Sequence, residues 1–506
     1  MTFTLFSVAI LMVFAVIAGL EIYQGMKKGF FKAMVAFGMA LLCMVISLIL
    51  APLLSDLIAT TVLAQYSSVE ICNMLRVRYE IAGDLILPII SLLSSIVLFV
   101  VLFLVLMLLR ALLAFAALDN EEYELAPKID EGTCSNKRML WLVQKRRALG
   151  GIVGALSAVL IAMVITSPLM GALDVANQLI DTANDFDDRI WDRVAMDTTE
   201  LESVQTYAAD IPGNVFYQLG GKHMFATVAT TQYKGEEVHL LDEIAVLKRT
   251  LKNLNVLLNC IGPNTVASEE DIANIYQLCE DIDDMKLLEL LVADFVSQSA
   301  KGWLDNKLVM GLEKPQVHPA FSKLWDQTLN ICAKTSVSQS KKNTITLLRI
   351  YAILLESGLT RTDINELALA QNIRQYDVIN RVQVELVANK NTAKLENEFK
   401  RAVLKTQIDY MFTYKFHSSV EDKTRYTKLT QNIAEVLSNI QNRGYINQER
   451  LISATSNAVK PYLNEYGLNF SDSMLTILSE AIADKLIYAY DEITADDVKE
   501  FLENYR

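Results

Sequence analysis

The stretch Leu85–Leu109, LILPIISLLSSIVLFVVLFLVLMLL, is twenty-five residues long and contains no charged side chain. At a rise of 1.5 Å per residue, a helix of this length crosses the ~30 Å hydrocarbon core of a bilayer. A buried helix of a water-soluble protein would carry a polar stripe, whereas the only polar side chains here are Ser91, Ser94 and Ser95. The stretch therefore predicts a transmembrane helix.

Three other stretches have a similar composition: Phe3–Leu20, Phe30–Leu54 and Leu149–Leu173. The only charged side chain in them is Lys32, which lies close enough to the end of its stretch to reach the membrane surface. Basic residues follow the first stretch and do not precede it, which favours a retained helix over a cleaved signal peptide. We therefore expect four transmembrane helices, at about residues 3–20, 30–54, 85–109 and 149–173, with three as the alternative number.

The composition of the whole chain of 506 residues agrees with a membrane protein, because 52% of it is apolar, 21% is charged and the mean hydropathy is +0.27. The net charge of −13 argues against a nucleic-acid-binding protein, which needs a basic face. Residues 1–174 are electrically neutral, so all the net charge lies after Asp174. We expect an all-α fold with a membrane domain at 1–174, an acidic connector at 175–240 and a mostly helical soluble domain at 241–506.

Lysine and arginine are distributed unevenly over the loops that join the four predicted helices. The first and third loops together hold ten of these residues, and the second loop holds two. Since basic loops stay in the cytoplasm, both termini are expected on the outer side of a cell membrane. The chain after Asp174 would then be extracytoplasmic.

Helix-capping patterns occur in the soluble part at Thr360, Ser471 and Thr494. They predict helices near residues 361–389, 472–489 and 495–505.

The connector contains one segment with a different pattern. Met224–Thr231 is rich in β-forming residues, and Lys234-Gly235 can turn it toward Val238. This pattern allows one short β-hairpin within the all-α fold.

Motifs that carry chemistry are absent from the sequence. The four histidines include no pair four residues apart, and Gly220-Gly221-Lys222 departs from a phosphate-binding loop and is interpreted as a turn. The acidic run Glu280–Asp284 is interpreted as a solvated helix end and not as a calcium loop. Cys260 and Cys279 are either bridged or free buried thiols. We predict no catalytic residue, no cofactor and no metal ligand, and hence no enzyme.

Small side chains recur every four residues along the last predicted membrane helix. This small-residue stripe consists of Gly150, Gly154, Ala158, Ala162 and Thr166. Small residues let two helix backbones approach closely in lipid, where helices have no hydrophobic drive to associate. The stripe predicts packing within the bundle or, alternatively, a homo-oligomer contact. In either case a leucine at Gly154 should disrupt packing more than a leucine at Val153.

Two motifs resemble the colicin V production (CvpA) family of bacterial inner-membrane proteins. The first is Gly25-Met26-Lys27-Lys28-Gly29-Phe30-Phe31, between two apolar helices. The second is Arg146-Arg147-Ala148-Leu149-Gly150-Gly151-Ile152-Val153-Gly154-Ala155, at the entry to the last one. The family-like residues are Gly25, Lys27, Lys28, Gly29, Phe30, Arg146, Arg147 and Gly151. The resemblance covers residues 3–175, about a third of the chain.

This resemblance implies a four-span protein of the bacterial cell membrane linked with toxin production or export, biofilm growth and envelope stress. It implies no catalytic residues. We expect the lipid bilayer as one partner and an unidentified protein as the partner of the soluble domain. A homo-oligomeric channel or transporter is the alternative function, and a membrane-tethered enzyme is a third.

Overall fold

The computed structural model describes residues 5–66, 82–118, 137–184, 214–262, 265–309, 312–334, 337–416, 419–444, 447–466 and 470–505. These residues are almost entirely helical, with one two-stranded sheet among them, which confirms the predicted all-α class. The chain divides into two compact units. Unit 1 comprises residues 1–252 with 284–290, and unit 2 comprises residues 253–283 with 291–506.

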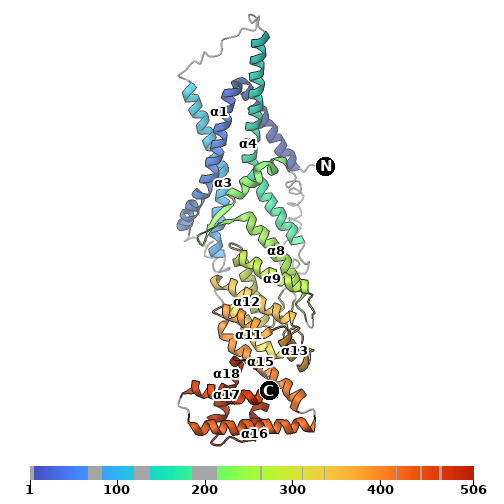
Figure 1. The fold of residues 1–506 in the computed structure, drawn as a ribbon. Helices are drawn as coiled ribbons and strands as arrows, with labels where there is room; N and C mark the ends of the chain where they lie inside the picture. The colour runs from blue at the N-terminus through green and yellow to red at the C-terminus, as the bar shows by residue number, and fades with distance from the viewer. Residues whose placement is uncertain are drawn as a thin grey trace. The chain divides into compact units, whose positions relative to one another are not determined.

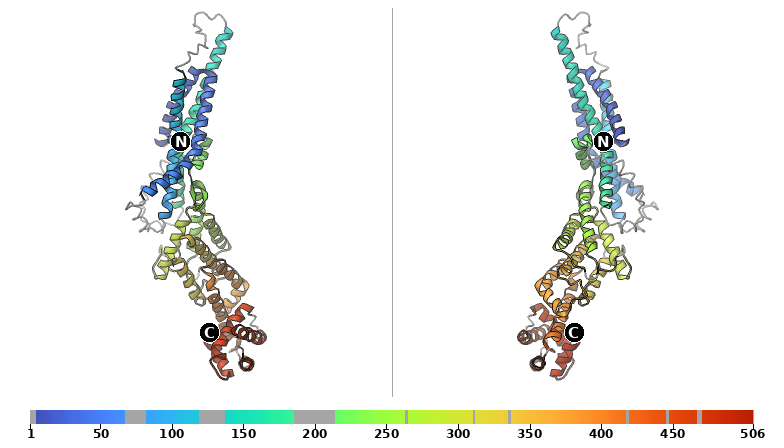
Figure 2. Two further views of the ribbon diagram at one scale, coloured as in Figure 1. Left: turned by 90° about the vertical axis from the view of Figure 1, so that its left-hand side faces the viewer. Right: turned by 90° about the vertical axis from the view of Figure 1, so that its right-hand side faces the viewer.

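Unit 1 is built on three long helices: α1 (Leu5–Tyr66), α3 (Ala82–Leu118) and α4 (Lys137–Asn184). The described part of the chain has three helices that are long and apolar enough to cross a membrane, and they are parts of these same three. They lie side by side in Figure 1 and in both views of Figure 2. The structure therefore has three candidate membrane helices and not the four separate ones predicted.

The count differs because no loop separates the first two predicted spans. Residues 3–20 and 30–54 fall in α1, apart from Phe3 and Thr4, which lie outside the described residues, and only Gly29 has non-helical angles inside it (φ 74°, ψ 172°). Glycine populates such positive φ values at little cost because it has no Cβ. Figure 1 shows α1 folding back on itself. Accordingly, Ile17 of the first arm packs against the same apolar cluster as Cys43 of the second.

This apolar cluster forms the centre of the bundle. Phe99 and Phe103 of α3 and Val164 of α4 are fully buried in it, and Ile161 of α4 is buried beside them. The outward faces of the same helices are apolar too: Val35 is 68% exposed and Val97 is 62% exposed. Apolar side chains on both the inner and outer faces are typical of helices surrounded by lipid.

After the bundle, unit 1 continues with short elements: the π-helix η2 (Tyr217–Gly221), α7 (Lys222–Val228), β1 (Thr230–Tyr233), β2 (Glu236–His239) and the start of α8 (Leu240–Asn259). The acidic residues 185–210 of the predicted connector lie outside the described residues.

The predicted hairpin is confirmed, because β1 pairs antiparallel with β2. Lys234 and Gly235, both with positive φ, form the turn. The prediction of β-structure from Met224 was wrong, since Lys222–Val228 is the helix α7. Phe225 and Val228, three residues apart, are both fully buried there, so packing of one helical face decides this segment over β-propensity.

Unit 2 contains α9 (Glu269–Asp284), α10 (Glu289–Leu304), η3 (Pro319–Phe321), α11 (Ser322–Lys334), α12 (Val337–Glu356), α13 (Glu366–Gln375), α14 (Val378–Ala388), η4 (Ala393–Leu395), α15 (Glu396–Met411), η5 (Phe412–Phe416), α16 (Val420–Arg443), α17 (Gln448–Glu465), α18 (Asp472–Ile482), η6 (Ala483–Ile487) and α19 (Ala495–Tyr505), with a few residues of α9 and α10 in unit 1. One continuous apolar core, from Leu257 to Leu502, joins them.

Two of the predicted capping residues form the expected caps, and one of the predicted helices is wrong. Ser471 accepts a hydrogen bond from the Met474 N–H at the start of α18, and Thr494 and Asp497 cap α19 reciprocally. The single helix predicted at 361–389 is wrong. The structure has α13, capped by Asn365, and then α14, because Asp377 adopts a left-handed conformation (φ 47°) that interrupts the helix.

Candidate functional site

The first and last helices of the bundle meet backbone to backbone. A Cβ placed on Gly150 would lie 2.3 Å from the carbonyl oxygen of Gly25, and one placed on Gly154 would lie 2.2 Å from that of Glu21. Neither distance is compatible with a side chain. We call this contact of Gly25, Gly150 and Gly154 the glycine seam. It joins one family-like motif to the other across more than a hundred residues of sequence.

The rest of the predicted stripe continues along the buried side of α4. Ala158 is fully buried and Ala162 is 1% exposed. Thr166 is buried as well, and its hydroxyl donates a hydrogen bond of 2.7 Å to the Ala162 carbonyl. The described bundle therefore places the small-residue stripe in intramolecular contacts at Gly150 and Gly154 and in the bundle interior beyond them.

The seam brings the basic residues of both family-like motifs to one end of the bundle. Lys27 and Lys28 are exposed, as are Arg146 and Arg147, while Gly29 makes the break in α1. Phe30 begins the second arm of α1, with its ring 5.5 Å from that of Phe31. Gly151 accommodates the side chain of Met26, whose Cγ would lie 3.0 Å from an added Cβ.

A buried carboxylate lies toward the other end of α4. Asp174 is 5% exposed, and its Oδ2 accepts hydrogen bonds from the Tyr217 hydroxyl (2.8 Å) and from Gln178 Nε2 (3.1 Å). The Tyr217 hydroxyl is the donor in the shorter of these two hydrogen bonds. Sequence reasoning missed this pair because its members are 43 residues apart.

Replacing Tyr217 with phenylalanine should loosen η2 from α4. The carboxylate of Asp174 would lose its shorter hydrogen bond while staying buried, at a cost of about 1–3 kcal/mol. In hydrogen exchange of the protein in detergent, the amides of residues 214–221 should then exchange faster. Tyr23→Phe is the matched control, because Tyr23 is 66% exposed; equal exchange in the two variants would contradict the expectation.

Polar groups also meet between the second arm of α1 and α3. The Ser91 hydroxyl donates a hydrogen bond to Asp56, and it lies 3.3 Å from the hydroxyl of Ser55. Ser95, one turn further along α3, is fully buried and finds no hydrogen-bond partner among the described residues. These hydroxyls form one polar patch in the bundle interior, in addition to Thr166 and Asp174 of α4.

The interpretation of Gly220-Gly221-Lys222 as a turn was wrong. These residues form the end of η2 and the start of α7, with the helix interrupted at Gly220 (φ 172°, ψ −13°). Lys222 and His223, which the phosphate-loop pattern would need at a ligand, are both exposed.

Unit 2 has a groove of about 840 Å³. Its walls come from α11, α15, α18, η6 and α19. Leu324, Ile477 and Phe501 supply apolar surface, and the ion pair of Lys323 with Glu398 (3.0 Å) also lines it. A groove of this size and mixed polarity suits a short protein segment.

The cysteines of unit 2 do not form disulfides with other described cysteines. Cys260, Cys279 and Cys332 are free and buried, so Cys260 and Cys279 are not bridged. Burial raises the pKa of Cys279 and of Cys332 to about 12, and that of Cys260 to about 11. Thiols held protonated in this way are poor nucleophiles.

We expect these thiols to resist a maleimide at pH 8 until the protein is unfolded in urea. Because their folded pKa values exceed the unfolded value of ~8.5, the folded state keeps protons that the unfolded state loses. Their contribution to stability is complete below pH 8.5 and declines as the pH rises toward 11–12. The urea midpoint should therefore fall from pH 8 to pH 10, and it should fall less in Cys332→Ala; an equal fall would contradict this assignment.

Within the described residues, no three His, Cys, Asp or Glu side chains are grouped so as to hold a metal ion. The interpretation of residues 280–284 as a solvated run was wrong at one position. Asp281 is fully buried and accepts a hydrogen bond of 2.9 Å from Asn253 Nδ2, whereas Asp283 and Asp284 are exposed.

Comparisons of the chain with protein-family models, with curated proteins and with solved structures find no match.

Proposed function

We propose that this chain is a non-enzymatic, four-span membrane protein of the CvpA type. Its unit 2, called the helical domain below, would be held at the membrane as a docking platform for another protein. The observation that carries the proposal is the glycine seam. A backbone contact this close between helices is the means by which membrane helices associate without a hydrophobic drive. The two motifs that resemble the CvpA family supply both sides of it.

The arms of α1 on either side of Gly29 supply two of the four crossings. The apolar part of α1 runs from Ile10 to Thr61, which is 52 residues. As one straight helix it would be ~78 Å long, far more than the ~30 Å hydrocarbon core of a bilayer. The break at Gly29 divides it into two lengths that each suit one crossing.

The helical domain provides the docking surface in this proposal. Its groove is lined by both apolar and charged side chains, which is the usual composition of a surface that binds a peptide segment or a helix. The three protonated thiols support a binding role over cysteine chemistry. In line with the resemblance, the pathway served would be toxin production or export, or upkeep of the bacterial envelope.

The basic end of the bundle is expected in the cytoplasm, with the N-terminus and the helical domain outside. Labelling of single cysteines in intact cells, on a background without the six native cysteines, tests this orientation. A membrane-impermeant maleimide should reach Lys390→Cys, an exposed position of the helical domain, without lysis. It should reach Lys28→Cys only after lysis. The reverse pattern would mean an inverted bundle, and labelling of both sites in intact cells would mean a different number of crossings between them.

A homo-oligomeric channel or transporter is the second candidate. The buried hydroxyls of Ser55, Ser91 and Ser95 favour it, because polar side chains inside a bundle can line a path. Conductance of the purified protein in liposomes, abolished by Ser95→Leu, would support this candidate over the docking platform. Absence of conductance would favour the docking platform. Capture of one defined partner from native membranes should then identify the protein that docks there.

A further inference from the structure

The segment formed by η2 and α7 packs against the middle of α4. A Cβ on Gly220 would lie 2.5 Å from the Cε of Met163, and one on Gly221 would lie 3.5 Å from the Cβ of Ser167. From the other side, the ring of Phe225 fills the space above Gly171, where a Cβ would lie 2.1 Å from it. These contacts position the segment along the length of α4.

The position of these contacts along α4 indicates how deep the segment lies in the bilayer. Arg147 and Asp174 are the charged residues that bracket the apolar part of this helix, twenty-seven residues or about 40 Å apart. Met163 lies eleven residues, about 16 Å, from Asp174 and about 24 Å from Arg147. A hydrocarbon core of ~30 Å must include the level of Met163 wherever it is placed within these 40 Å.

The first arm of α1 provides an independent measure of this depth. The ring of Phe216, which immediately precedes η2, lies 4.5 Å from the ring of Phe14. Phe14 is fourteen residues, about 21 Å, from Lys28 at the basic end of the bundle. The two helices therefore place Phe216, through α1, and Gly220, through α4, below the membrane surface on the side opposite Gly29.

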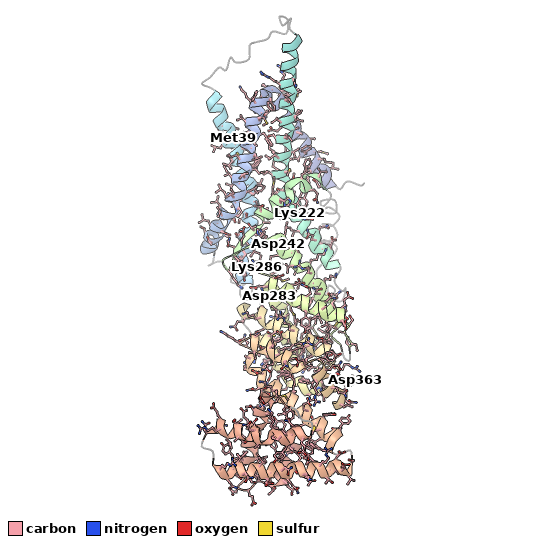
Figure 3. The ribbon with its side chains drawn as sticks, in the orientation of Figure 1. Met39, Lys222, Asp242, Asp283, Lys286 and Asp363 are labelled. Carbon is pink, nitrogen blue, oxygen red and sulfur yellow. The ribbon has the colours of Figure 1, made fainter. Side chains whose placement is uncertain are left out.

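The outer side of residues 215–219 carries two strongly exposed apolar side chains beside the exposed Gln218. Val215 and Leu219, four residues apart, are each 65% exposed. This fraction is close to that of Val97, which is 62% exposed on the outer face of a candidate membrane helix. Lys222 follows this face and is exposed (Figure 3). Its long side chain can extend to the lipid headgroups while its stem remains among apolar groups.

The backbone of the segment is compatible with lipid, where each polar group needs a partner. Asn214 caps its start, because its side-chain oxygen accepts the Phe216 N–H (3.0 Å) and its carbonyl accepts the Gln218 N–H (3.0 Å). The Lys222 N–H continues the pattern by donating to the Tyr217 carbonyl. Tyr217, the most polar side chain facing inward, is bonded to Asp174.

We propose that residues 214–228 form a re-entrant segment, which enters the leaflet opposite the basic end of the bundle and contacts lipid acyl chains through Val215 and Leu219. This inference rests on the proposed membrane-spanning bundle. It adds a lipid-embedded element between the last crossing and the helical domain.

Spin labelling in vesicles of phosphatidylcholine and phosphatidylglycerol tests the inference. Single cysteines at Leu219, Val97 and Lys390, on the background without native cysteines, carry a nitroxide. Collision with oxygen, which partitions into lipid, is compared with collision with a polar nickel chelate, which does not. At Leu219 the oxygen-to-nickel ratio should resemble that at Val97, and it should exceed that at Lys390 by on the order of tenfold.

The possible outcomes distinguish a failure of the re-entrant segment from a failure of the proposed membrane-spanning bundle. A label at Leu219 that prefers nickel, while Val97 prefers oxygen, would overturn the re-entrant segment and leave the membrane bundle intact. Nickel preference at both positions would overturn the bundle as well. Low collision with both reagents at Leu219 would mean that a second copy or a partner covers this face, and would overturn the lipid contact.

Discussion

Gly154→Ala should lower the thermal midpoint of the protein in detergent by on the order of 5–10 °C, because the added methyl group has no space. Its Cβ would lie 2.2 Å from the Glu21 carbonyl oxygen and 3.0 Å from the Ile22 Cα. These are backbone atoms of α1, which cannot rotate away as the end of a flexible side chain can. The helices must separate along the seam, at a cost of about 2–3 kcal/mol.

The matched control is Gly38→Ala on α1. A Cβ at Gly38 meets nothing within 4 Å, so alanine should leave the midpoint unchanged or raise it slightly through its better helix propensity. On α4, Ile152→Leu is a better control than a change at Val153, since Ile152 is 59% exposed and Val153 is 4% exposed. If Gly154→Ala and Gly38→Ala melt together, the seam does not stabilise the bundle.

Glu243→Ala should release the turn that precedes α10. The buried carboxylate of Glu243 accepts three backbone N–H groups, from Lys286, Leu287 and Leu288, at 3.0, 3.1 and 3.0 Å. Hydrogen bonds to a charged acceptor are stronger than neutral ones, and alanine leaves all three donors without it. We expect a loss of about 2–4 kcal/mol in the local stability of residues 284–290.

Hydrogen exchange followed by mass spectrometry measures this effect directly. The amides of Leu287 and Leu288 should exchange on the order of 30-fold faster or more, since each 1.4 kcal/mol is a factor of ten. Lys286 also pairs with Glu236 of the hairpin, and Glu289 pairs with Lys234. The first pair is exposed, and the Lys234 side chain of the second is 55% exposed, so both should hold the turn only weakly. The control is Glu237→Ala, an exposed residue of β2. Unchanged exchange at Leu287 in the Glu243 variant would refute the role assigned to this carboxylate.

The length of the apolar stretches was the most reliable predictor of the long helices. It predicted the wrong number of separate helices for a simple reason. Leu85–Leu109 and Leu149–Leu173 fall within α3 and α4. The first two stretches also fall in helical residues, but a break of a single glycine at Gly29 leaves no loop between them, and so one helix takes the place of two. The composition of a window of twenty residues does not show that a single residue is enough to reverse the direction of the helix.

Local patterns after Asp174 were informative only where local contacts decide the conformation. The cap of Thr494 with Asp497 is a contact within one turn, and it forms as predicted. By contrast, the helix predicted through Asp377 breaks there, and Met224–Val228 is helical although its residues favour strands. In both places the packing of a buried face against other elements outweighs a propensity of a few tenths of a kcal/mol per residue.

The sequence by itself determined that the chain is helical, that its first part is apolar enough for a bilayer, and that α4 carries small residues every fourth position. These properties depend on composition and on spacing within one helix. Only the tertiary structure decided that Gly150 and Gly154 meet Gly25 and Glu21, that Asp174 is held by Tyr217, and that Glu243 binds the turn before α10. Each of these contacts joins residues more than forty positions apart, and nothing in the local pattern of either partner specifies the other, because the match arises only when the backbones are brought together.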